Sequence, residues 1–288
     1  VSAGGDQNAI HFWSPAHIEG EQTGVIKGVG RVVHAVGITA DEKIGFGNHD
    51  DLRLEDGRIV LQRVFDLQRM TLNELPLHVG REWISSTVKE TIDTSASDSQ
   101  VWAVPRNTAG TEPAAHRILV GQTAPLRAHA VSDKWLVTAS DDQIIRLWYL
   151  NDVMRQGGLA DLLPALNLFV GSDDEWVIWS KSGYYNASQH GDRHFGYQVN
   201  RGADKEAVYF PGDRFSKVFF RRDIIQAIVE HGSEEMALRQ LKVKSIHVAE
   251  ILPPIVELAK NGVSSTPKQV TFTFTVKALD RKNPVTRV

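Results

Sequence analysis

The chain lacks cysteine, net basic charge and long apolar runs, and each absence excludes a class of function. None of its 288 residues is cysteine, which excludes disulfides, thiolate nucleophiles and cysteine-ligated zinc and favours a reducing, cytoplasmic setting. A formal net charge of −3 provides no basic field for nucleic-acid phosphates. No apolar run approaches the roughly 18 residues that span a bilayer. We therefore expect neither nucleic acid nor a membrane as a partner.

The residues that are present are typical of a folded β-protein. Hydrophobic residues make up 42% of the chain and charged residues 23%, which indicates a globular domain rather than a disordered segment. Over about the first 180 residues, short β-like runs alternate with turn signals, and helical periodicity is nearly absent. The chain begins at Val1 in what reads as the middle of a strand, so we expect a piece of a longer protein.

Two segments of the chain share one plan of strand, polar turn, strand and tryptophan. They are residues 2–13, which end at Trp13, and residues 138–148, which end at Trp148. Two more divergent units lie between them, at about 32–67 and 75–104. Their spacing is near the roughly 40–45 residues of a β-propeller blade. The sequence therefore predicts several consecutive blades.

The last of these units is the most regular. Residues 127–132, 135–138 and 144–150 read as three strands, with a turn at 141–143. Large side chains occupy both faces of the third strand, which is typical of a strand packed between two neighbouring sheets.

Residues 131–148 (VSDKWLVTASDDQIIRLW) resemble a WD40 repeat over most of one blade. In that family a histidine, a serine or threonine, an aspartate and a tryptophan form a hydrogen-bonded network within each blade. The resemblance places Thr138, Asp142 and Trp148 in three of these positions. Gln122 stands where the histidine is usual, and Gln7 occupies the turn-aspartate position of the first repeat.

The residues after this unit resemble bacterial WD40 proteins that carry a caspase-like (peptidase C14 type) protease. The resemblance covers roughly 168–258 and rests on LFV at 168–170, EWVIW at 175–179, GYYNAS at 183–188, GDR at 191–193, VNRG at 199–202 and RDII at 222–225. It implies a propeller, then an immunoglobulin-like domain, then a protease further along the polypeptide. Arg221-Arg222 departs from the Arg-Pro more often found there. The residues expected to be structural are Thr138, Asp142, Trp148, Trp13, Trp176, Tyr184, Tyr185, Asn200 and Arg201.

Helical spacing begins at about Asp213, and Gly232 followed by Ser233 predicts the end of one helix and the cap of the next. A prolyl pair at 253–254, a polar linker at 261–268 and an alternating strand at 270–276 follow. We expect a mainly β fold with a partial WD40-like β-propeller at 1–188, a helical extension at 189–258, and a linker with the first strands of an immunoglobulin-like β-domain at 259–288.

Three groups of residues could in principle carry chemistry. His190, Asp192 and His194 have a spacing that would suit metal ligands on a helix, but the glycine between them predicts loop or strand. The acidic run at 173–175 lacks an apolar pocket that would raise a pKa, so a solvated turn is expected. Ser140 lies outside any Gly-x-Ser-x-Gly elbow, and without cysteine no caspase-like nucleophile is present.

A non-catalytic interaction or sensor scaffold is therefore the expected function, with no cofactor and no bound metal. Its expected partner is another protein or a protease domain of the same polypeptide. The alternative is a metal-dependent hydrolase that uses His190, Asp192 and His194.

Overall fold

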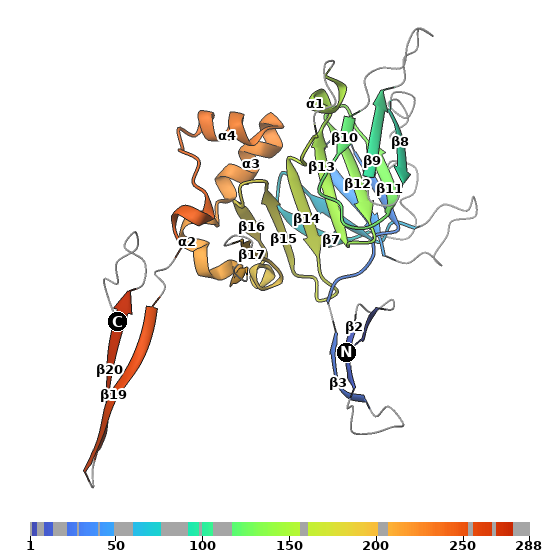
Figure 1. Ribbon diagram of the computed structural model, residues 1–288. Coiled ribbons are helices and arrows are strands. Elements are labelled where there is room, and N and C mark those ends of the chain that lie inside the picture. The colour runs from blue at the N-terminus through green and yellow to red at the C-terminus, as the bar shows by residue number, and fades with distance from the viewer. Residues whose placement is uncertain are drawn as a thin grey trace. The chain divides into compact units, whose positions relative to one another are not determined.

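The chain folds mainly into antiparallel β-sheets (Figure 1). The computed structural model describes residues 2–4, 9–13, 22–27, 29–39, 41–48, 60–75, 92–97, 100–105, 117–155, 161–200, 207–252, 256–266 and 269–278. The chain divides into two compact units, Val1–Ser245 and Ile246–Val288. No helix in the described ranges is long and apolar enough to cross a membrane.

In the described part of the first unit, four sheets have three or more strands, and the strands of each follow one another along the chain. Their strands are β1 (Ser2–Gly4), β2 (Ala9–Trp13) and β3 (Gln22–Lys27); β4 (Ala35–Ile38), β5 (Lys43–Gly47), β6 (Arg63–Asp66) and β7 (Thr71–Glu74); β8 (Ile92–Ser97), β9 (Gln100–Pro105) and β10 (Arg117–Leu119); and β11 (Leu126–Val131), β12 (Trp135–Ser140), β13 (Ile144–Tyr149), β14 (Leu166–Val170), β15 (Trp176–Ser180) and β16 (Tyr185–Ala187). Each is an up-and-down meander, and within the described strands no sheet closes on itself.

Strands β11, β12 and β13 fall where the sequence predicts three strands, but the sheet that contains them is larger than a four-stranded blade. It has six strands because β14, β15 and β16 continue the meander beyond β13. β15 buries four of its five residues, which stabilises a strand paired on both sides. A tight turn at 171–175, with Asp174 at a φ of 63°, joins β14 to β15 without leaving the sheet.

The sheets β4–β7 and β11–β16 pack against each other, and we call this junction the seam. β4 contacts β11 and β12. Phe65 of β6 meets the Trp176 ring edge-on, with centroids 4.9 Å apart. Glu42, in the turn before β5, accepts hydrogen bonds from Lys134 Nζ at 2.7 Å and Trp135 Nε1 at 3.3 Å. Apolar burial and a few charged contacts therefore join segments about ninety residues apart.

One hydrophobic cluster lies at the end of β13. It contains Leu119, Val131, Leu136, Trp148, Leu150 and Val153. A short helix that the sequence did not predict, α1 (Leu150–Met154), places Leu150 and Val153 in this cluster. Their spacing of three residues puts both on one helix face.

The helices after residue 190 pack on the outer strands of the six-stranded sheet. They are the 3₁₀ turns η1 (Gly191–His194) and η2 (Gly212–Phe215) and the helices α2 (Ser216–Phe219), α3 (Arg222–His231) and α4 (Glu234–Gln240), with the hairpin of β17 (Gly196–Val199) and β18 (Val208–Pro211) among them. α3 contacts β15 and β16 and buries Ile224, Ile225 and Ile228. Gly232 ends α3 at a φ of 77°, and Ser233 caps α4, as their residue types predict.

The second unit contains the turn η3 (Val248–Glu250) and one long hairpin. Its strands are β19 (Val256–Thr266) and β20 (Gln269–Ala278). The sequence predicted a polar linker at 261–268, but β19 continues to Thr266. A bulge between Lys260 and Gly262 leaves Asn261 as the extra residue, so the polar residues after it keep pairing with β20. An immunoglobulin-like domain at 259–288 stays a prediction.

Candidate functional site

Two buried polar contacts lie within the sheet β11–β16, at the positions that the WD40 resemblance singles out. The first joins Thr138 of β12 to Trp148 of β13. The Trp148 indole Nε1 donates to Thr138 Oγ1 at 2.9 Å, and the two residues are 0% and 1% exposed, respectively. This bond satisfies the indole N–H inside the sheet, where an unpaired donor would cost free energy.

The second contact is the Asp142 cluster, which consists of Asp142, Arg146, Ser140 and Thr123. Asp142 Oδ2 accepts from Arg146 Nη2 at 2.7 Å and from the Thr123 backbone N–H at 2.9 Å. Its Oδ1 accepts from Ser140 Oγ and from the Ile144 N–H. Burial raises the pKa of the Asp142 carboxyl, but the hydrogen bonds from Arg146 and Ser140 outweigh it and lower the pKa below the usual 3.8. Asp142 is therefore ionised.

Arg146 was not among the residues that the sequence singled out, although it holds this cluster together. Its side chain is 6% exposed, and it also donates to the Gly121 carbonyl at 2.6 Å. Gln122, in the position of the family's histidine, is buried, and its amide has no partner within the described ranges. Asp142 thus pairs with Arg146, which lies four residues later in β13. The sequence feature that could have pointed to Arg146 is a charged residue in a strand whose two faces are otherwise apolar.

The acidic turn at 171–175 and the histidine segment lie together at one end of β15. Asp173 Oδ2 lies 2.7 Å from Arg193 Nη2 and 3.0 Å from His194 Nε2. Glu175 accepts hydrogen bonds from Ser188 Oγ and from the His190 N–H at 3.0 Å. Burial raises the Asp173 pKa, but the hydrogen bond from Arg193 outweighs it, so the pKa is lowered. The Ser188 hydrogen bond lowers the Glu175 pKa.

Asp192 and His194 lie in the 3₁₀ turn η1, and His190 is the residue that precedes it, whereas the sequence predicted loop or strand. The turn forms because the Phe195 N–H bonds the Asp192 carbonyl. The His194 ring is 10% exposed and packs beside Phe169, with centroids 5.7 Å apart. Across the described ranges, no group of three or more His, Cys, Asp or Glu side chains is arranged to hold a metal ion.

Tyr184 and Tyr185 lie at the junction of the sheet and the helices. Tyr184 and Tyr185 are buried, and Tyr185 donates to the Gly212 carbonyl at 3.3 Å. Burial raises the Tyr185 pKa to about 12. Tyr197, which lies three residues before Asn200, donates a hydrogen bond to the Gly183 carbonyl at 2.8 Å. Trp13 is the last residue of β2, and Arg201 lies outside the described residues.

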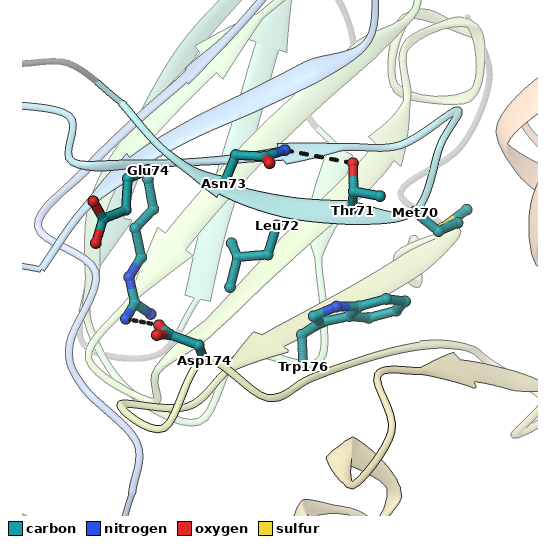
Figure 2. Close-up of a pocket in the computed structure, with 8 residues that line it drawn as sticks. Met70, Thr71, Leu72, Asn73, Glu74, Asp174 and Trp176 are labelled. Carbon is teal, nitrogen blue, oxygen red and sulfur yellow. Dashed lines mark hydrogen bonds and ion pairs between the residues drawn. The ribbon is translucent and has the colours of Figure 1, made fainter.

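An open groove lies at the outer end of the seam, and we call it the β7 groove (Figure 2). Its volume is about 330 Å³. β7 and the residue before it form one wall, and the segment from Asp174 to Trp176 forms the other. Arg63 closes one end, where it pairs with Asp174 and donates to the Gly171 carbonyl at 3.0 Å. The lining residues are Arg63, Met70, Thr71, Leu72, Asn73, Glu74, Asp174 and Trp176.

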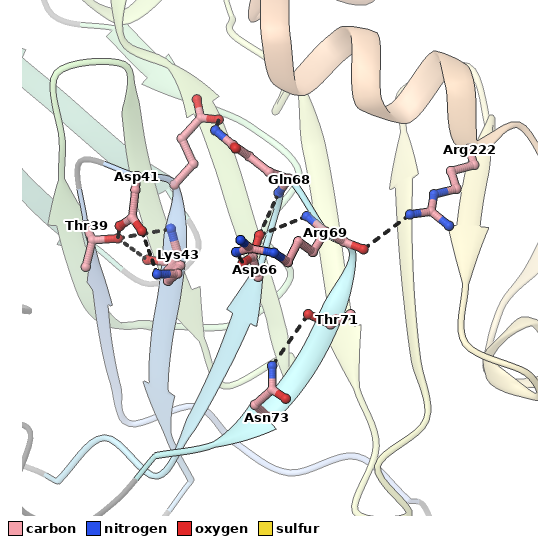
Figure 3. Close-up of polar contacts among 10 residues, drawn as sticks. Thr39, Asp41, Lys43, Asp66, Gln68, Arg69, Thr71, Asn73 and Arg222 are labelled. Carbon is pink, nitrogen blue, oxygen red and sulfur yellow. Dashed lines mark hydrogen bonds and ion pairs between the residues drawn. The ribbon is translucent and has the colours of Figure 1, made fainter.

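Polar contacts fix the turn between β6 and β7 at the other end of this groove (Figure 3). Asp66 accepts from the backbone N–H groups of Gln68 and Arg69 and pairs with the Arg69 side chain at 2.7 Å. Met70 then adopts a left-handed φ of 55° and returns the chain to β7. Arg222, at the start of α3, donates to the Arg69 carbonyl at 3.3 Å. Glu74 and Asp174 thus lie at one end of the groove, and Arg69 and Arg222 at the other.

Comparisons with known proteins found likeness only among solved structures. No protein-family model and no curated protein matches the chain. The WD40 β-propeller domain of Doa1 is 14% identical; the alignment covers 58% of this chain and 54% of that one, with a TM-score of 0.21. Hsv2 from Kluyvelomyces marxianus is 9% identical, with coverages of 55% and 50% and the same TM-score. This chain thus spans about half the length of each. Both TM-scores are too low to assign a fold or a function.

Proposed function

We propose that this chain is a cytoplasmic, non-catalytic protein-interaction module built from WD40-type blades. Its partner is another protein or a caspase-like protease domain of the same polypeptide, for which it acts as a regulatory or sensor part. The finer assignment to bacterial caspase-like WD40 proteins rests on the motifs at 168–258, and the cytoplasmic setting on the lack of cysteine.

The observation that carries the proposal is the β7 groove. A strand edge, an apolar wall and charged groups at both ends are the features by which sheets bind other chains. The two sheets that form the groove are held by buried contacts, which include Phe65 against Trp176. A rigid frame of this kind lowers the entropy that binding costs, because the surface is formed in advance.

The acidic turn and the histidine segment support binding rather than hydrolysis. A general acid needs a raised pKa, whereas the pKa values of Asp173 and Glu175 are lowered. His194 and Arg193 are both engaged by Asp173, which attaches η1 to the turn before β15. The side chains of Asp173, Arg193 and His194 therefore hold two segments of the fold together. In the same way, we assign structural roles to Thr138, Asp142 and Trp148.

Affinity capture with the complete chain tests the proposal. The chain is immobilised, and proteins retained from an extract of its source cell are eluted and weighed by intact mass spectrometry. We expect a partner at a fixed stoichiometry and with its full mass. Turnover of the retained protein into two fragments would contradict a non-catalytic role.

The alternative, a metal-dependent hydrolase, has its own test. Purified chain is incubated with a peptide library, with and without added Zn²⁺, together with His194→Gln and, as a matched control, His231→Gln, which lies outside the cluster. We expect no cleavage by any of the three proteins. Zn²⁺-dependent cleavage that His194→Gln abolishes and His231→Gln retains would establish the hydrolase instead.

A further inference from the structure

The outer edge of β7 is paired with no other strand in the described part of the chain. The register sets Val64 opposite Asn73 and Asp66 opposite Thr71, and the Leu75 N–H bonds the Gln62 carbonyl. In an antiparallel pair, hydrogen-bonded and non-hydrogen-bonded positions alternate. The N–H and C=O groups of Leu72 and Glu74 therefore point away from β6, and within the described ranges no strand pairs with that edge.

The side chains of the same two residues face the groove wall. Phe65 and Leu72 are cross-strand partners on one face, and Phe65 packs against Trp176. Leu72 is half-buried, and Figure 2 shows it between β7 and the Asp174–Trp176 segment. A cross-strand neighbour of Leu72 would enter the same apolar space. This space fits an aliphatic side chain.

The charges of the groove are divided between its ends. At one end, Glu74 is exposed and the Asp174 side chain is 71% exposed, with Arg63 as the one cation that lines the groove. At the other end, beside Met70, lie Arg69, which pairs with the buried Asp66 and has a side chain 74% exposed, and the exposed Arg222. A strand that runs antiparallel to β7 would place its first residues at the acidic end and its last residues at the basic end.

We propose that the β7 groove binds an extended segment of a partner protein that adds an antiparallel strand to β7. The segment has a basic residue opposite Glu74, an aliphatic residue two positions later opposite Leu72, and an acidic residue two positions after that, near Arg69 and Arg222. Successive alternate residues share one face of a strand, which sets this spacing. The inference rests on the proposed interaction function and names the site and the partner's chemistry.

A second copy of this chain fits the edge less well. Antiparallel self-pairing centred on Leu72 would need Met70 to pair as a strand residue opposite Glu74. Met70 has a left-handed φ and lies in a turn, so it cannot continue a paired strand. Met70 is also only 5% exposed, so little of its side chain could contact a second copy of the chain.

Fluorescence anisotropy with labelled synthetic peptides tests the proposal on the complete chain. The probe is acetyl-Lys-Thr-Leu-Thr-Glu-amide, and its control is the reversed peptide with Glu first and Lys last. We expect the first peptide to bind about five-fold more tightly, because exposed charge pairs contribute modestly. N-methylation of the leucine should abolish binding, since it removes the N–H that faces the Leu72 carbonyl. N-methylation of the first threonine should be tolerated, because that N–H faces solvent.

Charge reversal in the protein completes the test. Glu74→Lys should invert the preference between the two peptides, and Glu230→Lys, an exposed change on α3, should leave it unaltered. Equal binding of both peptides to all three proteins, or a concentration-dependent dimer in sedimentation that Glu74→Lys dissolves, would overturn the proposed site. If a captured partner is retained equally by wild type and Glu74→Lys, the interaction function stands and this groove is not its site.

Discussion

Replacing Asp142 with alanine leaves the Arg146 guanidinium buried without a carboxylate partner. The two side chains are 8% and 6% exposed, so solvent cannot replace the lost charge. Breaking a buried ion pair by removing one partner costs about 3–5 kcal/mol. The N–H groups of Thr123 and Ile144 lose an acceptor as well, and each such loss contributes about 1 kcal/mol. We expect Asp142→Ala to lower the free energy of unfolding by about 5 kcal/mol or more, or to prevent folding.

A double variant distinguishes the ion pair from a general effect of the substitution. Asp142→Ala combined with Arg146→Leu removes both charges, so the unfolding free energy should recover by about 2 kcal/mol relative to the single variant. Urea denaturation followed by circular dichroism gives both values. If Asp142→Ala costs less than about 1 kcal/mol, or if the two substitutions are additive, the account of the Asp142 cluster is wrong.

Three further changes test other parts of the structure. Thr138→Val removes the acceptor of the Trp148 N–H and should cost about 1–3 kcal/mol in urea denaturation, whereas Thr138→Ser should cost less. Gly232→Ala should lower the melting temperature, because φ is 77° there and the new methyl group would lie 2.2 Å from an aromatic ring. The hydrogen bond from Lys181 lowers the Glu235 pKa to about 2 from 4.5, so its stabilisation is present above pH 4.5 and lost as pH falls towards 2; Lys181→Met should flatten stability in that window.

The local structure could be predicted from the sequence where a short pattern determines it. Strands β12 and β13 follow from short, mostly apolar runs on either side of a polar turn. The boundary between α3 and α4 follows from Gly232 and Ser233, whose backbone angle and side-chain oxygen suit those positions. Thr138 and Trp148 lie ten residues apart in the sequence. Their contact could be predicted from the resemblance to a WD40 repeat.

Long-range contacts could not be predicted in this way. Glu42 bonds Trp135, and Arg63 pairs with Asp174, which lies 111 residues away. No local pattern encodes such a pairing, because it depends on how two sheets pack. The sixth strand of the last sheet and the strand beyond Lys260 were missed for a related reason, since cross-strand pairing overrides weak local preference.

The central claim is that the chain acts by binding at the open edge of β7. Amide hydrogen exchange of the free, complete chain tests it most directly, because only unpaired backbone groups exchange rapidly. We expect the Leu72 and Glu74 amides to exchange much faster than those of Asn73 and Leu75, which face β6, and to become protected on addition of the lysine-first peptide. Slow exchange of Leu72 and Glu74 in the free chain, or no change with the peptide, would contradict the claim.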